Sequence, residues 1–343
     1  MKKLLNTLYV TQPDIYLSLD GENVVAKREE ESVLRIPLHN LEAIVAFGYT
    51  GASPALMGAC AERSIALTFL TMSGRFLASV TGIEKGNVVL RKTQYRVSDS
   101  EEGSVRIARN ILTGKLHNSR WVLERAARDH ELRLDTKRLK DSSYALAENI
   151  HLLNKATTLA GLRGIEGESA VRYYSVFNDL ILQNKDSFIF EGRNRRPPLD
   201  RVNGLLSFVY TLLSNDVAAA LSAVGLDPFV GFLHRDRPGR RSLALDVMEE
   251  LRAPLADRFV LTLINNRQVN PAGFVKKENG AIIMKDETRR TVISAWQERK
   301  QDQITHPFLK EKISWGLVPH AQSLLLARHL RGDLEEYPPF LWK

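Results

Sequence analysis

The sequence predicts an α+β protein with more than one domain, in which a small β-rich N-terminal domain precedes a larger, all-α-helical domain. The 343 residues exceed the usual length of a single domain. The first hundred residues alternate apolar and polar side chains with the period of a strand, whereas later segments repeat apolar residues with the period of a helix. Because the pattern changes between Val97 and Glu102, we predict domains at 1–98 and 99–343.

The elements of the N-terminal domain are indicated by alternation, by short apolar runs and by turn residues. Apolar residues at 15, 17 and 19 alternate with polar ones, and Asp20-Gly21 is typical of a hairpin turn. Ser53-Pro54 suits an N-cap followed by proline in the first helical turn, which predicts a short helix through Cys60. Further strands are expected near 24–25, 34–38, 44–47, 65–70 and 76–78.

The C-terminal domain is expected to be helical because its apolar residues recur three and four positions apart. Val105, Ala108, Ile111 and Leu112 form the first such face. Further helical segments are expected at 118–128, 144–159, 169–182, 202–215, 217–224, 243–252 and 322–330.

Composition limits the classes of function. The 48 Lys and Arg residues against 40 Asp and Glu residues give a formal net charge of +8, which favours an anionic partner without establishing one. The single cysteine, Cys60, excludes an internal disulfide framework and a multi-thiolate metal centre. The basic first residues lack the apolar run of a signal peptide, and glycine, proline and polar residues break the longest uncharged stretch, 43–61. A soluble, cytoplasmic protein with no membrane partner is therefore expected.

Glu166 is the first candidate for chemistry. It lies between Gly164 and Gly167, and a helix extended backwards from the next apolar stripe places it on the same face as Tyr173. A buried carboxylate is unfavourable unless it is paired or coordinates a metal. The alternative interpretation is an acidic residue at a helix N-terminus, stabilised by the helix dipole, for which Glu168 serves equally well.

A second candidate combines one histidine with two carboxylates. His234 follows an apolar run, and Asp246 and Glu249 lie three residues apart on the next predicted helix, so both point the same way. The alternative is an exposed helix face with a structural histidine at a loop edge. The intervening loop carries the arginines that we consider the best candidates for DNA contacts: Arg235, Arg237, Arg240 and Arg241.

Taken together, the two segments supply mostly oxygen ligands and one imidazole. This set suits Mg²⁺ or Mn²⁺ better than structural zinc. Such an ion polarises a phosphoryl oxygen and activates an attacking hydroxyl. The loop arginines, with the further basic run at Arg193, Arg195 and Arg196, are suited to hold a phosphate backbone. Metal-dependent phosphodiester chemistry on nucleic acid is predicted, and the alternative is a basic protein with scattered surface arginines.

These segments resemble the CRISPR-associated Cas1 family of spacer-acquisition integrases and endonucleases, and the resemblance covers nearly the whole chain. The variant found in type I-C systems is the most similar. The resemblance is carried by Gly164-Ile165-Glu166-Gly167, Leu233-His234 and the run 242–252, with support from 195–203, 225–228, 330–333 and 337–340.

The resemblance implies a β-rich N-terminal domain, used for dimer and partner contacts, and a helical catalytic domain. It implies Glu166, His234 and Glu249 as ligands of Mg²⁺ or Mn²⁺, with Asp246 as a further catalytic carboxylate beside them. Leu251-Arg252-Ala253-Pro254 departs from the usual Phe-Arg-Pro of the family, and this departure is expected to affect how the helix ends.

The resemblance also implies an activity and its partners. Homodimers of the family flank a Cas2 dimer, capture a double-stranded DNA fragment and join each of its 3′-hydroxyls to a strand of the CRISPR array. With water as the nucleophile, the same site is a DNA endonuclease. Two alternatives remain open from the residues alone: a non-enzymatic basic DNA-binding scaffold protein, and a metal-dependent nuclease acting on RNA.

Overall fold

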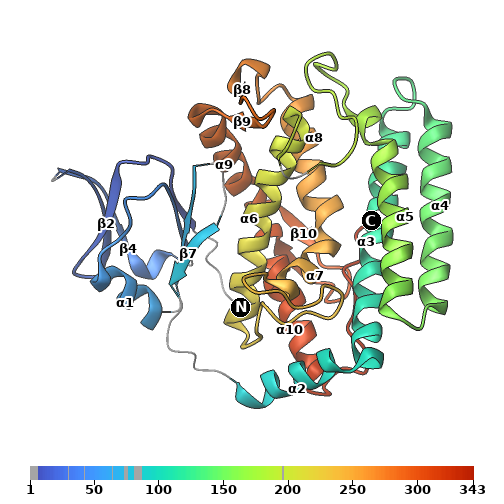
Figure 1. Ribbon diagram of the computed structural model, residues 1–343, viewed down its shortest axis with the longest axis horizontal. Helices are drawn as coiled ribbons and strands as arrows, with labels where there is room; N and C mark the ends of the chain where they lie inside the picture. The colour runs from blue at the N-terminus through green and yellow to red at the C-terminus, as the bar shows by residue number, and fades with distance from the viewer. Residues whose placement is uncertain are drawn as a thin grey trace. The chain divides into compact units, whose positions relative to one another are not determined.

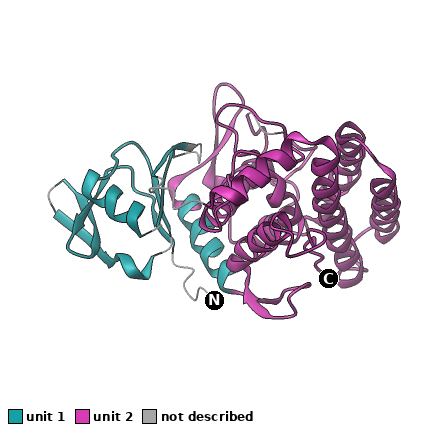
Figure 2. Cartoon of the chain, turned by 90° about the horizontal axis from the view of Figure 1, so that it is seen from below, with its two compact units in different colours: residues 1–86, 289–301 teal, residues 87–288, 302–343 magenta. Residues whose placement is uncertain are grey.

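The computed structural model describes residues 7–29, 31–41, 43–63, 65–72, 76–80, 87–194 and 197–343. The chain forms two compact units, which Figure 2 colours separately. Unit 1 comprises Met1–Gly86 and Arg289–Gln301, and unit 2 comprises Asn87–Thr288 and Asp302–Lys343. Unit 1 is rich in strands and unit 2 is largely helical, which confirms the predicted β-rich N-terminal part and helical C-terminal part.

The described part of unit 1 contains two sheets. The four-stranded sheet has the order β1 (Thr7–Val10), β5 (Ala43–Phe47), β6 (Ala66–Leu70) and β7 (Phe76–Val80); only the β6–β7 pair is antiparallel. The second sheet joins the antiparallel strands β2 (Ile15–Asp20), β3 (Asn23–Arg28) and β4 (Glu31–Pro37). The predicted hairpin turn is confirmed, because Asp20 pairs with Asn23 and Gly21 has a φ of +57° that suits glycine.

Helix α1 (Pro54–Glu62) fills the core of unit 1 and begins as predicted. Ser53 Oγ accepts a hydrogen bond from the Leu56 amide at 3.2 Å, and Pro54 is the first helical residue. Leu56 and Cys60 are fully buried in one apolar cluster with residues of the strands, such as Leu17. Burial raises the pKa of the Cys60 thiol to about 11, which agrees with a packing residue rather than a nucleophile.

The two units divide at a different place from the predicted boundary. Helix α2 (Val88–Asp99) belongs to unit 2, where Gln94 and Ser98 donate hydrogen bonds to the backbone of Val230 and Gly231 at 2.8 and 2.7 Å. Residues 289–301 of helix α9 (Asp286–Gln301) belong to unit 1. These associations join segments that are far apart in the sequence, and local periodicity carries no information about them.

Long helices build unit 2, as Figure 1 shows. The bounds are α3 (Glu101–Asp129), α4 (Thr136–Lys155), α5 (Leu159–Ser175), α6 (Arg201–Ala223), α7 (Ser242–Leu251), α8 (Arg258–Asn265) and α10 (Val318–Leu330). Two small hairpins complete the unit: β8 (Phe274–Lys276) with β9 (Ile282–Met284), and β10 (Gln303–Thr305) with β11 (Lys312–Ser314). Helix α3 packs against α4, α5 and α7, so it brings together the two segments that carry the candidate site residues.

Helix α6 is the one helix in the described part of the chain that is long and apolar enough to cross a membrane. It has 23 residues, and its most apolar window has a mean hydropathy of 1.4. However, 67% of that window is buried inside the structure, and residues such as Leu205, Val209 and Leu213 are fully enclosed. The predicted segments 202–215 and 217–224 are therefore one continuous core helix.

Helices α7 and α8 are joined without a break by a π-helical turn, Arg252–Asp257. Pro254 lies inside this turn and has no amide to donate to the carbonyl of Glu250, four residues earlier. The buried Asn118 side chain supplies the missing hydrogen bond, donating to Glu250 O at 2.7 Å. The departure from the family pattern at Arg252-Ala253-Pro254 was expected to affect how the helix ends. Instead, the helix continues through a π-helical turn.

The segment after α10 folds back onto Glu250 and Asn118. The Phe340 amide and the Gln322 side chain donate hydrogen bonds to Glu250 Oε2 at 2.7 and 2.8 Å. Asn118 Nδ2 donates to Phe340 O at 2.7 Å, and its Oδ1 accepts from the Trp342 amide at 2.8 Å. Residues 337–342 therefore form part of the wall behind helix α7.

Candidate active site

Glu166 lies in the middle of helix α5, not at its N-terminus. The helix begins at Leu159, where the Thr158 side chain accepts a hydrogen bond from the Gly161 amide at 3.1 Å. The predicted backward extension of the helix is therefore confirmed, and the helix-dipole interpretation does not apply to Glu166. A Cβ at either Gly164 or Gly167 would meet nothing within 4 Å, so the two glycines leave open space beside the carboxylate.

Lys115 links Glu166 to Glu249. It projects from helix α3, and its ammonium donates a hydrogen bond to Glu166 Oε1 and lies 2.8 Å from Glu249 Oε2. Burial alone would lower the pKa of Lys115, but the charges of Glu249 and Glu166 outweigh it and raise the pKa. The lysine is therefore a buried ammonium shared by two carboxylates from different helices.

Glu249 has a cation on each carboxylate oxygen. Arg252 Nη2 lies 3.0 Å from Oε1, opposite the contact with Lys115. Burial would raise the pKa of Glu249, but the positive charges of Arg252 and Lys115 lower it to about 2. Glu249 is thus fully ionised at neutral pH, although its side chain is only 4% exposed.

The Asp246 carboxylate fixes the position of His234. It accepts hydrogen bonds from the backbone amides of Phe232, Leu233 and His234 at 2.6, 2.9 and 3.0 Å, and it lies 2.6 Å from His234 Nδ1. With this partner Nδ1 carries the ring proton, which leaves Nε2 as the acceptor nitrogen. Asp246 is completely buried and both of its oxygens are used.

Two further contacts hold the loop that carries His234. Gly231 is required by the close approach of Asp246, because a Cβ there would lie 2.8 Å from Asp246 Oδ2. The Arg163 guanidinium, one turn before Glu166 on α5, donates two hydrogen bonds to Leu233 O at 3.1 and 2.7 Å. The loop is therefore fastened to the helix that supplies Glu166.

The side chains brought together are suited to a divalent cation. Among the described residues, no three His, Cys, Asp or Glu side chains form a ready-made metal site, and Lys115 lies between the two glutamates. The donor set is nevertheless appropriate: two ionised carboxylates and the Nε2 of His234. Glu249 Oε2 is also buried without a well-aligned hydrogen bond, despite its contact with Lys115. Glu166, Glu249 and His234 would hold the ion.

The arginines predicted to contact DNA fall into two groups. Arg235 and Arg237 are exposed beside His234. Arg240 and Arg241 are partly buried, because they donate hydrogen bonds to Ser242 Oγ and Asn215 Oδ1 at 3.2 and 2.8 Å. The latter two arginines therefore help to shape the loop. In the second basic run, Arg193 packs on helix α6, and Arg195 and Arg196 lie outside the described residues.

The sequence analysis missed Lys115 and Arg252. Both had a signal: Lys115 lies three and four residues after Leu112 and Ile111, on the face predicted to be buried, and Arg252 follows Glu249 by three residues. A lysine on an apolar helix face needs an anionic partner. The spacing of residues in the sequence did not reveal that Lys115 has two such partners, Glu166 on α5 and Glu249 on α7.

Asp257 lies behind the site and connects three elements. Tyr210 on α6 and Tyr173 on α5 donate hydrogen bonds to its two oxygens at 2.5 and 3.1 Å. Arg252 stacks over the Tyr210 ring, 5.0 Å from its centroid. Burial raises the pKa of Asp257 to about 6, although the hydrogen bonds from the two tyrosines act in the opposite direction.

Asp257 is expected to make stability fall as pH rises. Its pKa is about 6 in the folded chain against 3.8 without the fold, so the folded state binds more protons between these values. Protonated Asp257 contributes about 3 kcal/mol to the free energy of unfolding. This contribution is complete below about pH 4 and is lost as pH rises through 6. In urea unfolding, Asp257→Asn should therefore gain about this much stability relative to the unmodified chain between pH 4 and pH 7. A difference that stays constant with pH would contradict the assignment.

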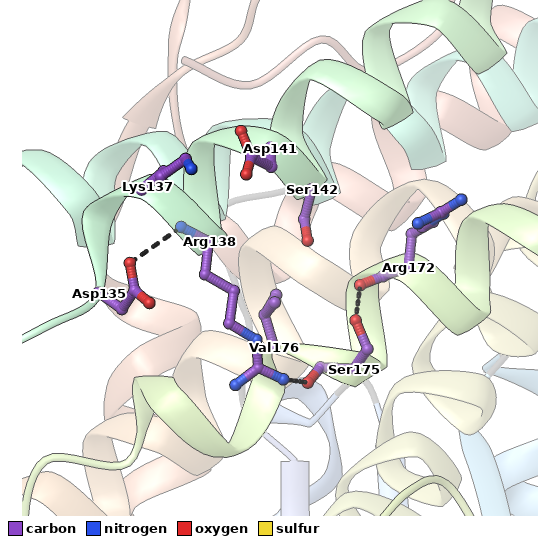
Figure 3. A pocket seen from close by; sticks show the side chains of 8 residues that line it. All are labelled: Asp135, Lys137, Arg138, Asp141, Ser142, Arg172, Ser175 and Val176. Atoms are coloured by element: carbon purple, nitrogen blue, oxygen red, sulfur yellow. Dashed lines mark hydrogen bonds between the residues drawn. The ribbon is translucent and has the colours of Figure 1, made fainter.

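A separate hollow of about 430 Å³ lies between the start of α4 and the end of α5, and Figure 3 shows its lining side chains. Arg138 crosses it and donates a hydrogen bond to Ser175 O at 2.6 Å. Arg172 lies at its edge and pairs with Glu168 at 2.7 Å. None of the predicted site residues lines this hollow.

Comparisons with known proteins agree with the fold. In structure, the chain resembles a casposase bound to its integration product, with a TM-score of 0.84, 22% identity and coverage of 98% of this chain and 93% of the other. It also resembles a Cas1 protein from Thermotoga maritima, with a TM-score of 0.81, 23% identity and coverage of 95% and 97%. These likenesses define the fold class.

Sequence similarity identifies the family. The family model described as CRISPR associated protein Cas1 matches residues 8–298. The CRISPR-associated endonuclease Cas1 1 of Chlorobaculum tepidum is 51% identical, and the CRISPR-associated endonuclease Cas1 2 of Rhodospirillum rubrum is 50% identical, each over the full length of both chains. The chain therefore belongs to the Cas1 family and is an enzyme of the CRISPR-associated endonuclease class. Its assignment to type I-C systems stays a prediction.

Proposed function

We propose that the chain is a divalent-metal-dependent DNA endonuclease and integrase, which inserts double-stranded DNA fragments into a CRISPR array. The observation that carries the proposal is the meeting of Glu166 and Glu249, from α5 and α7, at a single cation, Lys115 Nζ. His234 is held by Asp246, which lies 2.6 Å from its Nδ1, and is close enough to affect the pKa of Glu249. The arrangement brings anionic oxygens from two different helices to one point of positive charge.

Each side chain has a separate task in the proposed reaction. Mg²⁺ or Mn²⁺, when bound by Glu166, Glu249 and His234, would stabilise the charge that develops on the phosphate. Asp246 holds Nδ1 of His234, which would leave Nε2 to bind the ion. Arg252 keeps Glu249 ionised and in place.

The bond changes need no covalent bond to the protein. In strand joining, the 3′-hydroxyl oxygen of the fragment forms a bond to the phosphorus of the array strand as the phosphorus–oxygen bond to the departing 3′-oxygen breaks. The proton of the attacking hydroxyl passes to solvent, and the departing oxygen takes one up. With water as the nucleophile, the same exchange is hydrolysis.

The proposed partners are double-stranded DNA, a Cas2 dimer and a second copy of this chain, acting in the cytoplasm and without a membrane. A solved structure of the same fold is a Cas6-RT-Cas1–Cas2 complex, with a TM-score of 0.83 and 24% identity; this chain covers 36% of its length. The casposase structure contains an integration product. Exposed Arg235 and Arg237, next to His234, are suited to contact phosphates at the site.

One assay separates this function from its alternatives. Purified protein is incubated with a 3′-hydroxyl DNA fragment and a repeat-bearing plasmid, with Mn²⁺ or with a chelator, beside a matched RNA substrate. Joined and cleaved DNA is expected only with the metal. A scaffold protein would show salt-sensitive DNA binding and no product in any lane. Cleavage confined to RNA would instead identify a ribonuclease.

A further inference from the structure

Lys115 occupies the place between the two glutamates that a metal ion would have to share. Its side chain is 13% exposed, and it contacts Glu166 and Glu249 at the same time. Arg252 contacts Glu249 on the opposite carboxylate oxygen. Lys115 is thus the residue that holds the carboxylates of α5 and α7 together.

The charges of this cluster are already balanced. The two carboxylates face one ammonium and one guanidinium, so the four groups sum to zero. A divalent ion bound between the carboxylates would lie against the ammonium, and like charges this close repel each other strongly even at a moderate effective dielectric. The ammonium and the metal ion cannot both occupy the space between Glu166 and Glu249.

Of the two cations, Lys115 is the one able to leave. Arg252 is stacked on the Tyr210 ring at 5.0 Å and is a planar group fixed by its neighbours. Lys115 has a flexible stem of four methylene groups, and its ammonium is strongly hydrated once it reaches water. Glu166, one of the two acids that it contacts, is 29% exposed, so solvent reaches this side of the cluster.

We propose that Lys115 is a placeholder for the metal: its ammonium keeps Glu166 and Glu249 together in the metal-free protein and is displaced when Mg²⁺ or Mn²⁺ binds. The inference rests on the proposed function, because it requires that the two glutamates bind the ion. Lys115 acts as a positioning residue toward the metal. Its presence lowers the affinity for the ion and keeps the metal-free site from opening through repulsion of the two acids.

The test is Mn²⁺ binding measured by titration calorimetry on the full chain without DNA. Lys115→Met removes the charge but keeps most of the stem, and it should bind Mn²⁺ at least about tenfold more tightly than the unmodified chain. Lys115→Arg keeps a cation at the site and should not gain affinity. Lys140→Met removes an exposed lysine from α4 and should stay within about threefold of the unmodified chain, because a distant surface charge is screened.

Thermal melting provides a second readout that does not depend on activity. Without metal, Lys115→Met should melt several degrees below the unmodified chain, because Glu166 and Glu249 then repel each other. Added Mn²⁺ should raise its melting temperature by more than it raises that of the unmodified chain. Lys115→Gln, which retains a hydrogen-bond donor, serves if the methionine variant does not fold.

The outcomes distinguish the placeholder from the metal site itself. If Glu249→Gln abolishes Mn²⁺ binding but neither neutral Lys115 variant binds more tightly than the unmodified chain, the placeholder role is wrong and the metal site stands. If Glu249→Gln binds Mn²⁺ as well as the unmodified chain does, the proposed metal site is wrong and the placeholder fails with it.

Discussion

Glu249→Gln is expected to lower metal-dependent strand joining by about a thousandfold or more, the range seen when a transition state loses its main electrostatic support. Glutamine keeps the shape of the side chain and can still accept a hydrogen bond from Arg252. It cannot supply the anionic oxygen that a divalent ion requires. Because Glu249 is buried against two cations, the change should also cost about 3 kcal/mol of stability.

The measurement is single-turnover joining of a 3′-hydroxyl fragment to a repeat-bearing plasmid, together with urea unfolding. Glu166→Gln and His234→Ala should lose activity to a similar extent, and both should lose less stability because their side chains are 29% and 28% exposed. Glu168→Gln is the matched control: it lies two residues from Glu166, pairs with Arg172 and is 46% exposed. If the three site variants joined DNA as fast as this control, the site assignment would be wrong.

Asp246→Asn is expected to lower strand joining about a hundredfold and stability by about 2–4 kcal/mol. Asp246 uses both oxygens to accept four hydrogen bonds, three of them from consecutive backbone amides. An asparagine would turn an NH₂ group toward at least one N–H, and it could not fix the proton on Nδ1 of His234 as firmly. The loop and the imidazole should therefore lose their positions together.

Metal affinity, activity and urea unfolding should be measured on the same preparation. Asp236→Asn removes an exposed carboxylate from the same loop and should behave as the unmodified chain in all three. A folded Asp246→Asn variant with full activity would show that His234 needs no carboxylate partner. Wild-type stability of this variant would show that the four hydrogen bonds contribute little.

Sequence patterns predicted the parts of the molecule that depend on local periodicity. The prediction that Glu166 and Tyr173 lie on one helix is confirmed, because α5 is continuous through both residues. The start of α1 at Pro54 follows from capping chemistry confined to a few residues. The pair His234 and Asp246 was found because the two residues lie in one short segment, where loop and helix meet.

The remaining features depend on contacts between distant segments. Residues 289–301 belong to unit 1 although they lie in the sequence between segments of unit 2. The π turn at Arg252–Asp257 forms because Asn118, on another helix, satisfies the carbonyl that Pro254 leaves without its amide. Lys115 could be recognised as a lysine on a buried face, but only the packing of α3 between α5 and α7 shows which acids it joins.

The hydrogen bonds at Glu250 have a consequence for synthesis on the ribosome. Its carboxylate finds its donors in residues 322 and 340, which are translated well after Glu166, His234 and Glu249. Until those later residues emerge, the Glu250 carboxylate lacks these two donors and helix α7 lacks part of the wall behind it. A nascent or prematurely terminated polypeptide should therefore lack an assembled catalytic centre, which would spare cellular DNA from cleavage by incomplete copies.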